Sequence, residues 1–346
     1  MQLLDSVPDF LDLERLKSAY LKDKDVFNKD FEYCIVIGIG GSSQGSKAIN
    51  SFLNEEKVIY FDHLNYHLIN KTLNSLDLKK TGFIFVSKSG LTSEILTLFD
   101  YLSGELENKI NISKHFYTIT EIKSSPLHDL STQKSIPIIK HDEDIAGRFS
   151  IFSNASLLPG FIYNEKMVDN FFKGAKLGVE KEIMAQNRAI SKQAYIDKGL
   201  SINAMLIYGD QLIELGNWLK QLYAESLGKN NRGYLPVVSP MPKDQHSLMQ
   251  LYIDGPKNTF FEIISMKYKQ NNFINVTLTN HKEAMYSTIE SKSLPFLGIE
   301  ELEEDKILEL GSFLSNRMLE VVHHAKIIDV DPFNQDAVEA QKNFLK

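Results

Sequence analysis

Short apolar runs that stop at glycine or serine recur in the first half of the chain. Residues 34–37 are apolar and lead into glycines, and residues 82–86 lead into serines and a further glycine. A run of this length that stops at a turn is typical of a strand buried on both faces of a parallel sheet. The segments that follow the two runs, 42–53 and 92–102, have the character of helices. Strand, turn and helix therefore alternate here.

The second half of the chain is richer in helical patterns. An amphipathic stretch covers 164–193, and 210–226 is predicted to be a helix with Asp210 at its N-cap. The other expected elements are one or two helices in residues 1–30, strands at 115–120, 136–140, 203–208, 259–265 and 273–279, and helices at 305–324 and from 336 to the end. This alternation predicts an α/β protein with doubly wound parallel sheets flanked by helices.

A chain of 346 residues is long enough for two domains of ordinary size. The sequence suggests a boundary near Pro159-Gly160, which gives domains at 1–159 and 160–346. Hydrophobic residues make up 43% of the chain, enough for a normal core, so no disulfide framework is needed. The one cysteine, Cys34, lies in an apolar run and is expected to be a buried, inert thiol.

The net charge, the first ten residues and the apolar runs argue against several classes of protein. The net charge is −7 and lysines and arginines form no cluster, so nucleic-acid binding is not expected. The first ten residues carry acids and lack a basic start, unlike a signal peptide. No run approaches the roughly 18 apolar residues that a membrane span needs. We therefore expect a cytoplasmic protein whose partners include neither nucleic acid nor membrane.

The turn at residues 38–45 is rich in glycine and serine. A dinucleotide fingerprint places a third glycine three residues after the second, but the position counted from Gly40 is Ser43. A nucleotide P-loop requires lysine where this chain has Ser46. What remains is a turn that offers the Ser42 hydroxyl and backbone N–H groups to an anion at a helix start. The residues alone leave open a turn that only packs strand against helix.

A second turn of similar character follows the second apolar run. Ser87, Ser89 and Thr92 supply three hydroxyl groups around Lys88, again where a strand becomes a helix. Hydroxyls and helix N-terminal N–H groups can surround a phosphate without a large cationic patch. Two such turns at the carboxyl ends of neighbouring parallel strands face the same crevice. They favour a phosphorylated ligand over the alternative, in which the hydroxyls only cap helices.

These two turns resemble the sugar-phosphate loops of the sugar-isomerase (SIS) fold. Further motifs resemble the arginine, glutamate, histidine and C-terminal segments of the phosphoglucose isomerase family, and they are Gly147-Arg148-Phe149-Ser150, Ala224-Glu225-Ser226-Leu227-Gly228-Lys229, Gln245-His246-Ser247 and residues 331–342. The matches run in the family's order from residue 35 to residue 342. The resemblance implies two SIS-type domains.

The resemblance also implies an aldose–ketose isomerase that interconverts glucose 6-phosphate and fructose 6-phosphate through an enediol or enediolate. Glu225 is the implied base, and Arg148 is the implied stabiliser of the intermediate. His246 and Lys342 are the implied pair that opens the sugar ring, and Gln335 would orient substrate hydroxyls. The implied phosphate-binding residues are Gly41, Ser42, Ser87, Lys88, Ser89 and Thr92.

Neither a cofactor nor a metal is implied. His63 and His67 are four residues apart, but the residues between them lack the acid of the zinc-protease motif. In the family the histidine segment reaches the neighbouring subunit, so the resemblance implies a homodimer in which the His246 segment completes the neighbouring site. Two alternatives stay open. One is a dual phosphoglucose/phosphomannose isomerase, and the other is a non-catalytic SIS-fold sensor of sugar phosphates.

Overall fold

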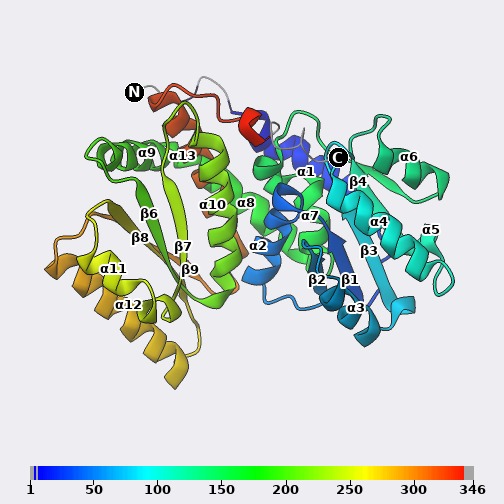
Figure 1. Cartoon of the computed structure of the whole chain (residues 1–346), viewed down its shortest axis with the longest axis horizontal. Coiled ribbons are helices and arrows are strands. Elements are labelled where there is room, and N and C mark those ends of the chain that lie inside the picture. Colours follow the sequence, from blue (N-terminus) through cyan, green and yellow to red (C-terminus); the bar gives the residue numbers. More distant parts are fainter. Residues whose placement is uncertain (1–3, 5–6, 339–346) are drawn as a thin grey trace. The chain divides into compact units, whose positions relative to one another are not determined.

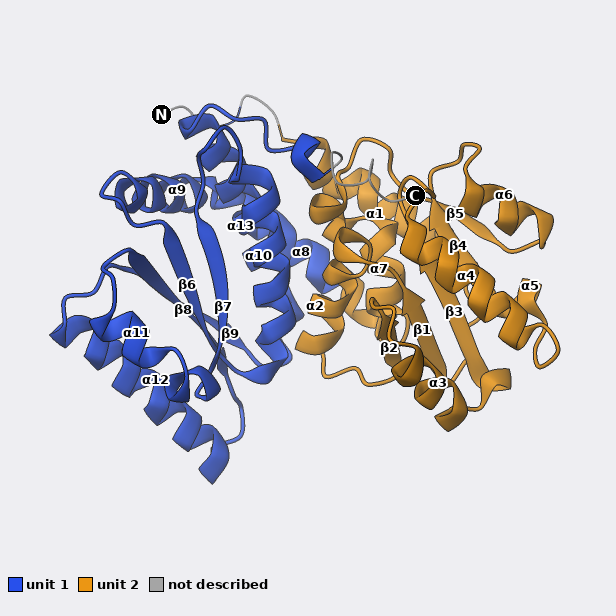
Figure 2. Ribbon diagram, in the orientation of Figure 1, with its two compact units in different colours: residues 1–5, 169–346 blue, residues 6–168 orange. Residues whose placement is uncertain are grey.

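The computed structural model describes residue 4 and residues 7–338, and it divides the chain into two compact units (Figure 2). The N-terminal unit consists of residues 6–168, and the C-terminal unit consists of residues 169–346 together with 1–5. The boundary expected at Pro159-Gly160 falls instead inside helix α7 (Asn154–Phe161) of the N-terminal unit. The Pro159 carbonyl accepts a hydrogen bond from Asn50 Nδ2 at 3.1 Å, which holds this helix to its own unit.

The N-terminal unit is built on a five-stranded parallel sheet of order β2-β1-β3-β4-β5 (Figure 1). Its strands are β1 (Tyr33–Ile37), β2 (Val58–Phe61), β3 (Thr81–Val86), β4 (Phe116–Thr120) and β5 (Ile138–Lys140). All six residues of β3 are buried, as the uninterrupted apolar run predicts for a strand covered on both faces. Cys34 in β1 is a fully buried thiol, as the sequence predicts.

Helices precede, connect and follow these strands. They are α1 (Leu13–Asp23), α2 (Gln44–Phe52), α3 (Tyr66–Ser75), α4 (Ser93–Leu106), α5 (Ile112–His115), α6 (Pro126–Gln133) and α7, with 3₁₀ turns η1 (Asp9–Leu11), η2 (Gly40–Ser42), η3 (Leu78–Lys80), η4 (Gly147–Phe152) and η5 (Glu165–Met167). Phe85 of β3 packs against Phe99 of α4, with ring centroids 4.9 Å apart. Contacts of this kind fix the helices that follow the two glycine- and serine-rich turns.

The C-terminal unit contains a four-stranded parallel sheet of order β7-β6-β8-β9. Its strands are β6 (Ile202–Tyr208), β7 (Leu235–Met241), β8 (Thr259–Lys267) and β9 (Phe296–Glu303). Its helices are α8 (Val168–Glu180), α9 (Glu182–Ile196), α10 (Ile213–Leu227), α11 (Met249–Asp254), α12 (Phe273–Ser291) and α13 (Ile307–Ile327), with 3₁₀ turns η6 (Asp210–Leu212) and η7 (Lys243–His246). Helices on both faces of the sheet complete the fold class that the sequence predicts.

The strand expected at 273–279 is wrong, because these residues form the first turns of α12. The side chain of Asn272 caps this helix by accepting a hydrogen bond from the Asn275 N–H at 2.9 Å. Phe273 and Ile274, which gave the segment its strand-like pattern, are 86% and 77% exposed. Two parallel neighbours, β8 and β9, need a long crossover between them, and α12 supplies it. The topology overrides the local preference of these residues for a strand.

The amphipathic stretch 164–193 forms η5, α8 and α9, and Lys181 separates the last two helices. One smaller expectation changes. Asp210 lies in η6, and α10 begins at Ile213 without a side-chain cap. None of the helices in the described part of the chain is both long enough and apolar enough to cross a membrane.

A cluster of buried charges joins α9, β8, α10 and α13 in the C-terminal unit. Lys192 Nζ lies 2.8 Å from Glu320 Oε1 and 3.4 Å from Glu262 Oε1. Arg317 donates to Glu320 at 2.9 Å and to Glu262 at 3.0 Å. Arg317 also donates to the hydroxyl of Tyr223 on α10, at 3.2 Å. We call Lys192, Glu262, Arg317 and Glu320 the charge cluster. It fixes the position of α10 relative to α13.

Candidate active site

The two glycine- and serine-rich turns lie at the same edge of the N-terminal sheet. Strands β1 and β3 are direct neighbours, with Ile37 paired to Phe85, so both turns begin at adjacent carboxyl ends. Neighbouring strands are about 5 Å apart. Helices α2 and α4 begin directly after the two turns and bring their N-terminal ends to this edge. The juxtaposition that the sequence predicts for the two turns is confirmed.

The first turn is fastened to the segment that carries Arg148. A Cβ atom added to Gly41 would come within 2.3 Å of the Gly147 carbonyl carbon, so only glycine permits this approach. Ser150 Oγ donates to the carbonyls of Gly147 at 2.7 Å and of Gly41 at 3.3 Å. Arg148 is 1% exposed, and its guanidinium lies over the Phe149 ring. The arginine and the Ser42 turn therefore belong to one packed structure.

The second turn is tightly ordered. Ser87 is 1% exposed, and its hydroxyl lies 3.0 Å from that of Thr92, the N-cap of α4. Gly90 has a φ of +67°, and a Cβ there would collide with Ser125 Oγ at 2.2 Å. Ser89 Oγ accepts a hydrogen bond from the Leu91 N–H at 3.2 Å. Glycine at position 90 is thus required both by the backbone and by the close approach of the next loop.

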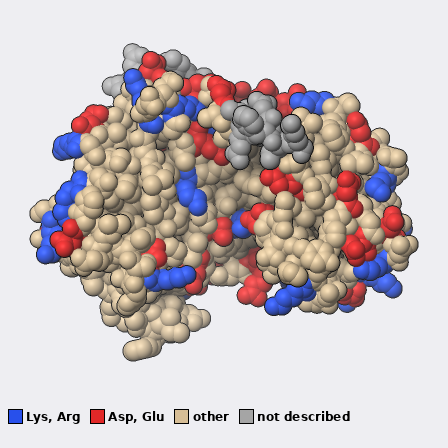
Figure 3. Space-filling view, in the orientation of Figure 1, with Lys and Arg blue, Asp and Glu red and all other residues tan. Residues whose placement is uncertain are grey.

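Lys88 turns toward the loops that follow β4 and β5. Its Nζ donates to the carbonyl of Glu143 at 2.5 Å and lies 3.9 Å from the carboxylate of Glu121, which also pairs with Lys123. Figure 3 shows lysines and arginines scattered among acidic residues on the visible face of each unit. The Lys88 ammonium is the cation that the sequence analysis placed in the second turn.

Glu225 and Gln335 line the same pocket of the C-terminal unit, a cavity of about 710 Å³. Its walls come from two segments, 224–232 at the end of α10 and 330–338 beyond α13. Glu225 is half-buried in the last turn of α10, where its Oε1 accepts a hydrogen bond from Gln221 Nε2 at 3.0 Å. The structure therefore brings together two residues that lie more than one hundred positions apart in the chain.

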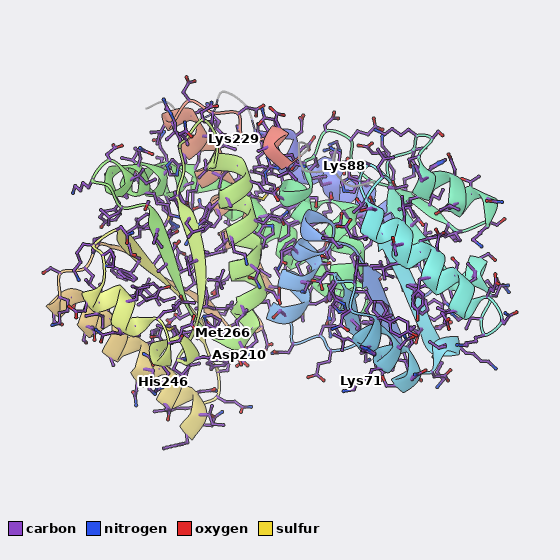
Figure 4. The ribbon with its side chains drawn as sticks, in the orientation of Figure 1. Lys71, Lys88, Asp210, Lys229, His246 and Met266 are labelled. Atoms are coloured by element: carbon purple, nitrogen blue, oxygen red, sulfur yellow. The ribbon has the colours of Figure 1, made fainter. Side chains whose placement is uncertain are left out.

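His246 does not share this pocket. Helix α10 runs back from the carboxyl end of β6, so Glu225 lies at the amino edge of the sheet, whereas η7 follows the carboxyl end of β7. Gln245 Nε2 donates to the hydroxyl of Tyr208, the last residue of β6, at 3.3 Å. Strand β7 alone spans roughly 20 Å at about 3.3 Å per residue. Figure 4 shows Lys229, four residues after Glu225, and His246 at opposite ends of the unit.

Two further expectations concern residues outside these sites. Lys342 lies outside the described residues. His63 precedes the start of α3 at Tyr66, and its Nδ1 accepts a hydrogen bond from the Asn65 N–H at 3.2 Å, so it and His67 do not share one helical turn. In the described part of the chain, no group of three or more His, Cys, Asp or Glu side chains is placed to bind a metal ion.

Sequence reasoning missed three residues that shape these sites. Gln221 lies four positions before Glu225 in α10, and that helical spacing could have marked it as a neighbour. Lys229 lies beyond the end of α10 at Leu227, where no such spacing applies. Ser150 holds the arginine segment to the Gly41 turn. Ser150 lies in the arginine motif, but no local pattern indicates this contact, because it joins residues more than one hundred positions apart.

Comparison with known proteins identifies the family. The family model described as phosphoglucose isomerase matches residues 13–291, a range that ends before Gln335 and Lys342. A glucose-6-phosphate isomerase from Campylobacter jejuni is 31% identical over 70% of this chain, which spans 64% of that relative. A glucose-6-phosphate isomerase from Mycoplasma mycoides is 30% identical over 94% of this chain and 85% of its own length.

A solved structure supports the fold over the full length. A hypothetical protein from Thermus thermophilus superposes with a TM-score of 0.87 at 24% identity, covering 97% of this chain and 88% of that one. Its likeness confirms the α/β architecture with two parallel sheets. Together with the family match over most of the sequence, these findings show that the chain belongs to the phosphoglucose isomerase family.

Proposed function

We propose that this protein is an aldose–ketose isomerase that interconverts glucose 6-phosphate and fructose 6-phosphate. The observation that carries the proposal is the pocket shared by Glu225 and Gln335 in a chain of the phosphoglucose isomerase family. A carboxylate and a neutral amide that line one pocket suit the removal of a proton from a carbon that bears hydroxyl groups. The proposal also agrees with the names of the two relatives.

The proposed chemistry uses the two sites as follows. Glu225 takes the proton from C2 of the open-chain aldose, and the electron pair forms the C1–C2 double bond of an enediolate. The same carboxyl group returns the proton to C1, while the C2 hydroxyl loses its proton and the C1 oxygen gains one, which yields the C2 carbonyl of the ketose without net oxidation. Arg148 stabilises the negative oxygen of the intermediate, because its charge is permanent and its donors are fixed. We assign ring opening to His246 and Lys342 and the orientation of hydroxyls to Gln335.

We assign phosphate binding to the edge of the N-terminal sheet. The hydroxyls of Ser42, Ser87 and Thr92 lie there, where two helices begin and their dipoles favour an anion. The remaining members of the proposed phosphate site are Gly41, Lys88 and Ser89. We further propose that the protein acts in the cytoplasm, in glycolysis and gluconeogenesis. The single buried thiol, which has no disulfide partner, fits a reducing compartment.

A coupled assay tests the function directly. The protein is expected to convert fructose 6-phosphate to glucose 6-phosphate, detected by glucose-6-phosphate dehydrogenase, without added metal and in the presence of EDTA. Mannose 6-phosphate is assayed in parallel, because turnover of both aldoses would identify the dual-specificity isomerase. Binding of fructose 6-phosphate without any turnover would instead support a sensor and end the proposal.

We also propose a homodimer in which the His246 segment completes the neighbouring site. The separation of Glu225 and His246 across the sheet supports this arrangement, since one copy holds them at opposite edges. The exposed Phe273 and Ile274 begin α12 after the carboxyl end of β8, at the same edge as His246. A second copy could bury this apolar pair while it receives the histidine.

Mixing two inactive variants tests this arrangement. Glu225→Gln and His246→Ala are each expected to be nearly inactive alone. If the histidine acts in the neighbouring subunit, a mixed dimer contains one site with both natural residues, and random mixing restores about a quarter of the wild-type sites. Unfolding and refolding the variants together provides the exchange, and each variant refolded alone is the control. Failure of the refolded mixture to regain activity would mean that both residues act within one copy.

A further inference from the structure

The pocket around Glu225 is closed by a turn that follows α13. Lys229 Nζ donates a hydrogen bond to the carbonyl of Asn334 at 2.8 Å and another to the carbonyl of Asp331. Lys229 is half-buried and lies four residues after Glu225, just beyond the end of α10, whereas Asn334 directly precedes Gln335. The ammonium group therefore joins the two segments that make the walls of the pocket.

A second cation from the same loop holds the end of α13. Arg232 Nη1 donates to the carbonyl of Ile328, the C-cap of that helix. Helix C-termini leave carbonyl groups without partners in the helix, and a cation there is favourable. The loop after α10 thus contacts both the end of α13 and the turn beyond it. Asn230 and Asn231, with φ of 52° and 58°, shape this loop so that Lys229 and Arg232 face the same segment.

The turn itself has internal order. The carboxylate of Asp331 accepts a hydrogen bond from the Phe333 N–H at 2.8 Å, and the Gln335 carbonyl accepts one from the Val338 N–H at 3.0 Å. These bonds set the local shape of residues 331–338 but do not reach α10. The bonds from Lys229 join the turn to the chain just beyond the end of α10, so they contribute to where the turn lies relative to Glu225.

We propose that Lys229 is a positioning residue that fixes the distance between the Glu225 carboxylate and the Gln335 amide. This inference rests on the proposed function, because it assumes that both groups act on one sugar phosphate. A lysine ammonium has three donors, enough to bond both carbonyls at once. Without it, the turn that carries Gln335 loses both of these bonds to the loop after α10. Misplacement by about 1 Å can cost up to about 10²-fold in rate.

Lys229→Met tests the inference, because methionine keeps the apolar stem and removes the donors. The expected result is a fall in kcat/KM of about 10–10²-fold, with the loss largely recovered in Lys229→Arg, which can also donate to two carbonyls. Lys220→Met is the matched control, since Lys220 is exposed on α10 and bonds only Asn217 among the contacts the structure describes. The control is expected to keep wild-type activity.

Two further readouts separate positioning from a general structural effect. Hydrogen exchange at the Phe333 amide is expected to accelerate in Lys229→Met and to stay unchanged in Lys220→Met. Combined with Gln335→Ala, Lys229→Met is expected to add little further loss of kcat, because both changes remove the same contribution. Unchanged exchange at Phe333, or full additivity of the two losses, would overturn the inference. The exchange experiment is informative even if the protein fails to isomerise either hexose phosphate.

Discussion

Glu225→Gln is expected to lower kcat by about 10²–10⁴-fold, because glutamine cannot accept the proton that leaves C2. The two side chains have nearly the same size. The oxygen of the new amide can still accept the hydrogen bond that Gln221 Nε2 donates to Glu225 Oε1 at 3.0 Å. Glu225 is half-buried at the end of α10, so the change removes a charge without opening a cavity. Folding and substrate binding should therefore survive, and the loss should appear in kcat rather than in KM.

Isotope exchange distinguishes loss of the base from loss of another step. In deuterated water the wild-type protein is expected to incorporate deuterium at the carbon that is reprotonated, and Glu225→Gln is expected to do so at a rate reduced as much as kcat. Glu214→Gln is the matched control, since Glu214 lies in the first turn of the same helix, at its opposite end. Equal turnover by Glu225→Gln and the wild type would exclude this carboxylate as the base.

The sequence was sufficient to predict where the two glycine- and serine-rich turns lie, for a physical reason. Residues 34–37 and 82–86 are apolar throughout, which only a strand covered on both faces tolerates, and each run stops at residues that permit a tight turn. Because β1 and β3 are parallel neighbours, these two local signals suffice to place Ser42 and Ser87 at one edge. The roles assigned to individual residues of this edge stay predictions.

The sequence could not predict those features of the fold and the site that depend on contacts between distant segments. The stretch 273–279 has a strand's alternation of apolar residues, yet it becomes a helix because β8 and β9 are parallel and need a crossover. Lys229 reads as an ordinary surface lysine until the turn at 331–334 brings two carbonyls to it. The end of the N-terminal unit at residue 168 is likewise set by the packing of α7, not by a linker composition.

The second substitution with a large expected effect lies in the charge cluster that packs against α10. Burial alone would raise the pKa of Glu262, but the positive charges of Lys192 and Arg317 outweigh it and lower that pKa to about 2. Both carboxylates of the cluster are therefore ionised at neutral pH, and they are compensated by Lys192, by Arg317 and by Arg188, whose Nε lies 3.6 Å from Glu320 Oε2. Glu262, Arg317 and Glu320 are at most 2% exposed, so water cannot replace a missing partner.

Arg317→Met is expected to lower the free energy of unfolding of the C-terminal unit by about 3–5 kcal/mol, because removing one partner leaves a buried negative charge uncompensated. It also removes the bond to the Tyr223 hydroxyl, which ties α10 to α13. Trp218, the only tryptophan in the chain, is buried in α10, so its fluorescence during urea unfolding reports on this unit.

The matched control is Lys269→Met, which breaks a 3.2 Å ion pair with Asp305 in the same unit, where the two side chains are 51% and 58% exposed. That pair is screened by water, so its loss should cost less than about 1 kcal/mol. The contrast follows from burial alone, since both changes replace one cation by the same apolar side chain. An Arg317→Met protein as stable as the Lys269→Met protein would show that the cluster is compensated by solvent or by rearrangement. In that case α10 would be held in place chiefly by its apolar face.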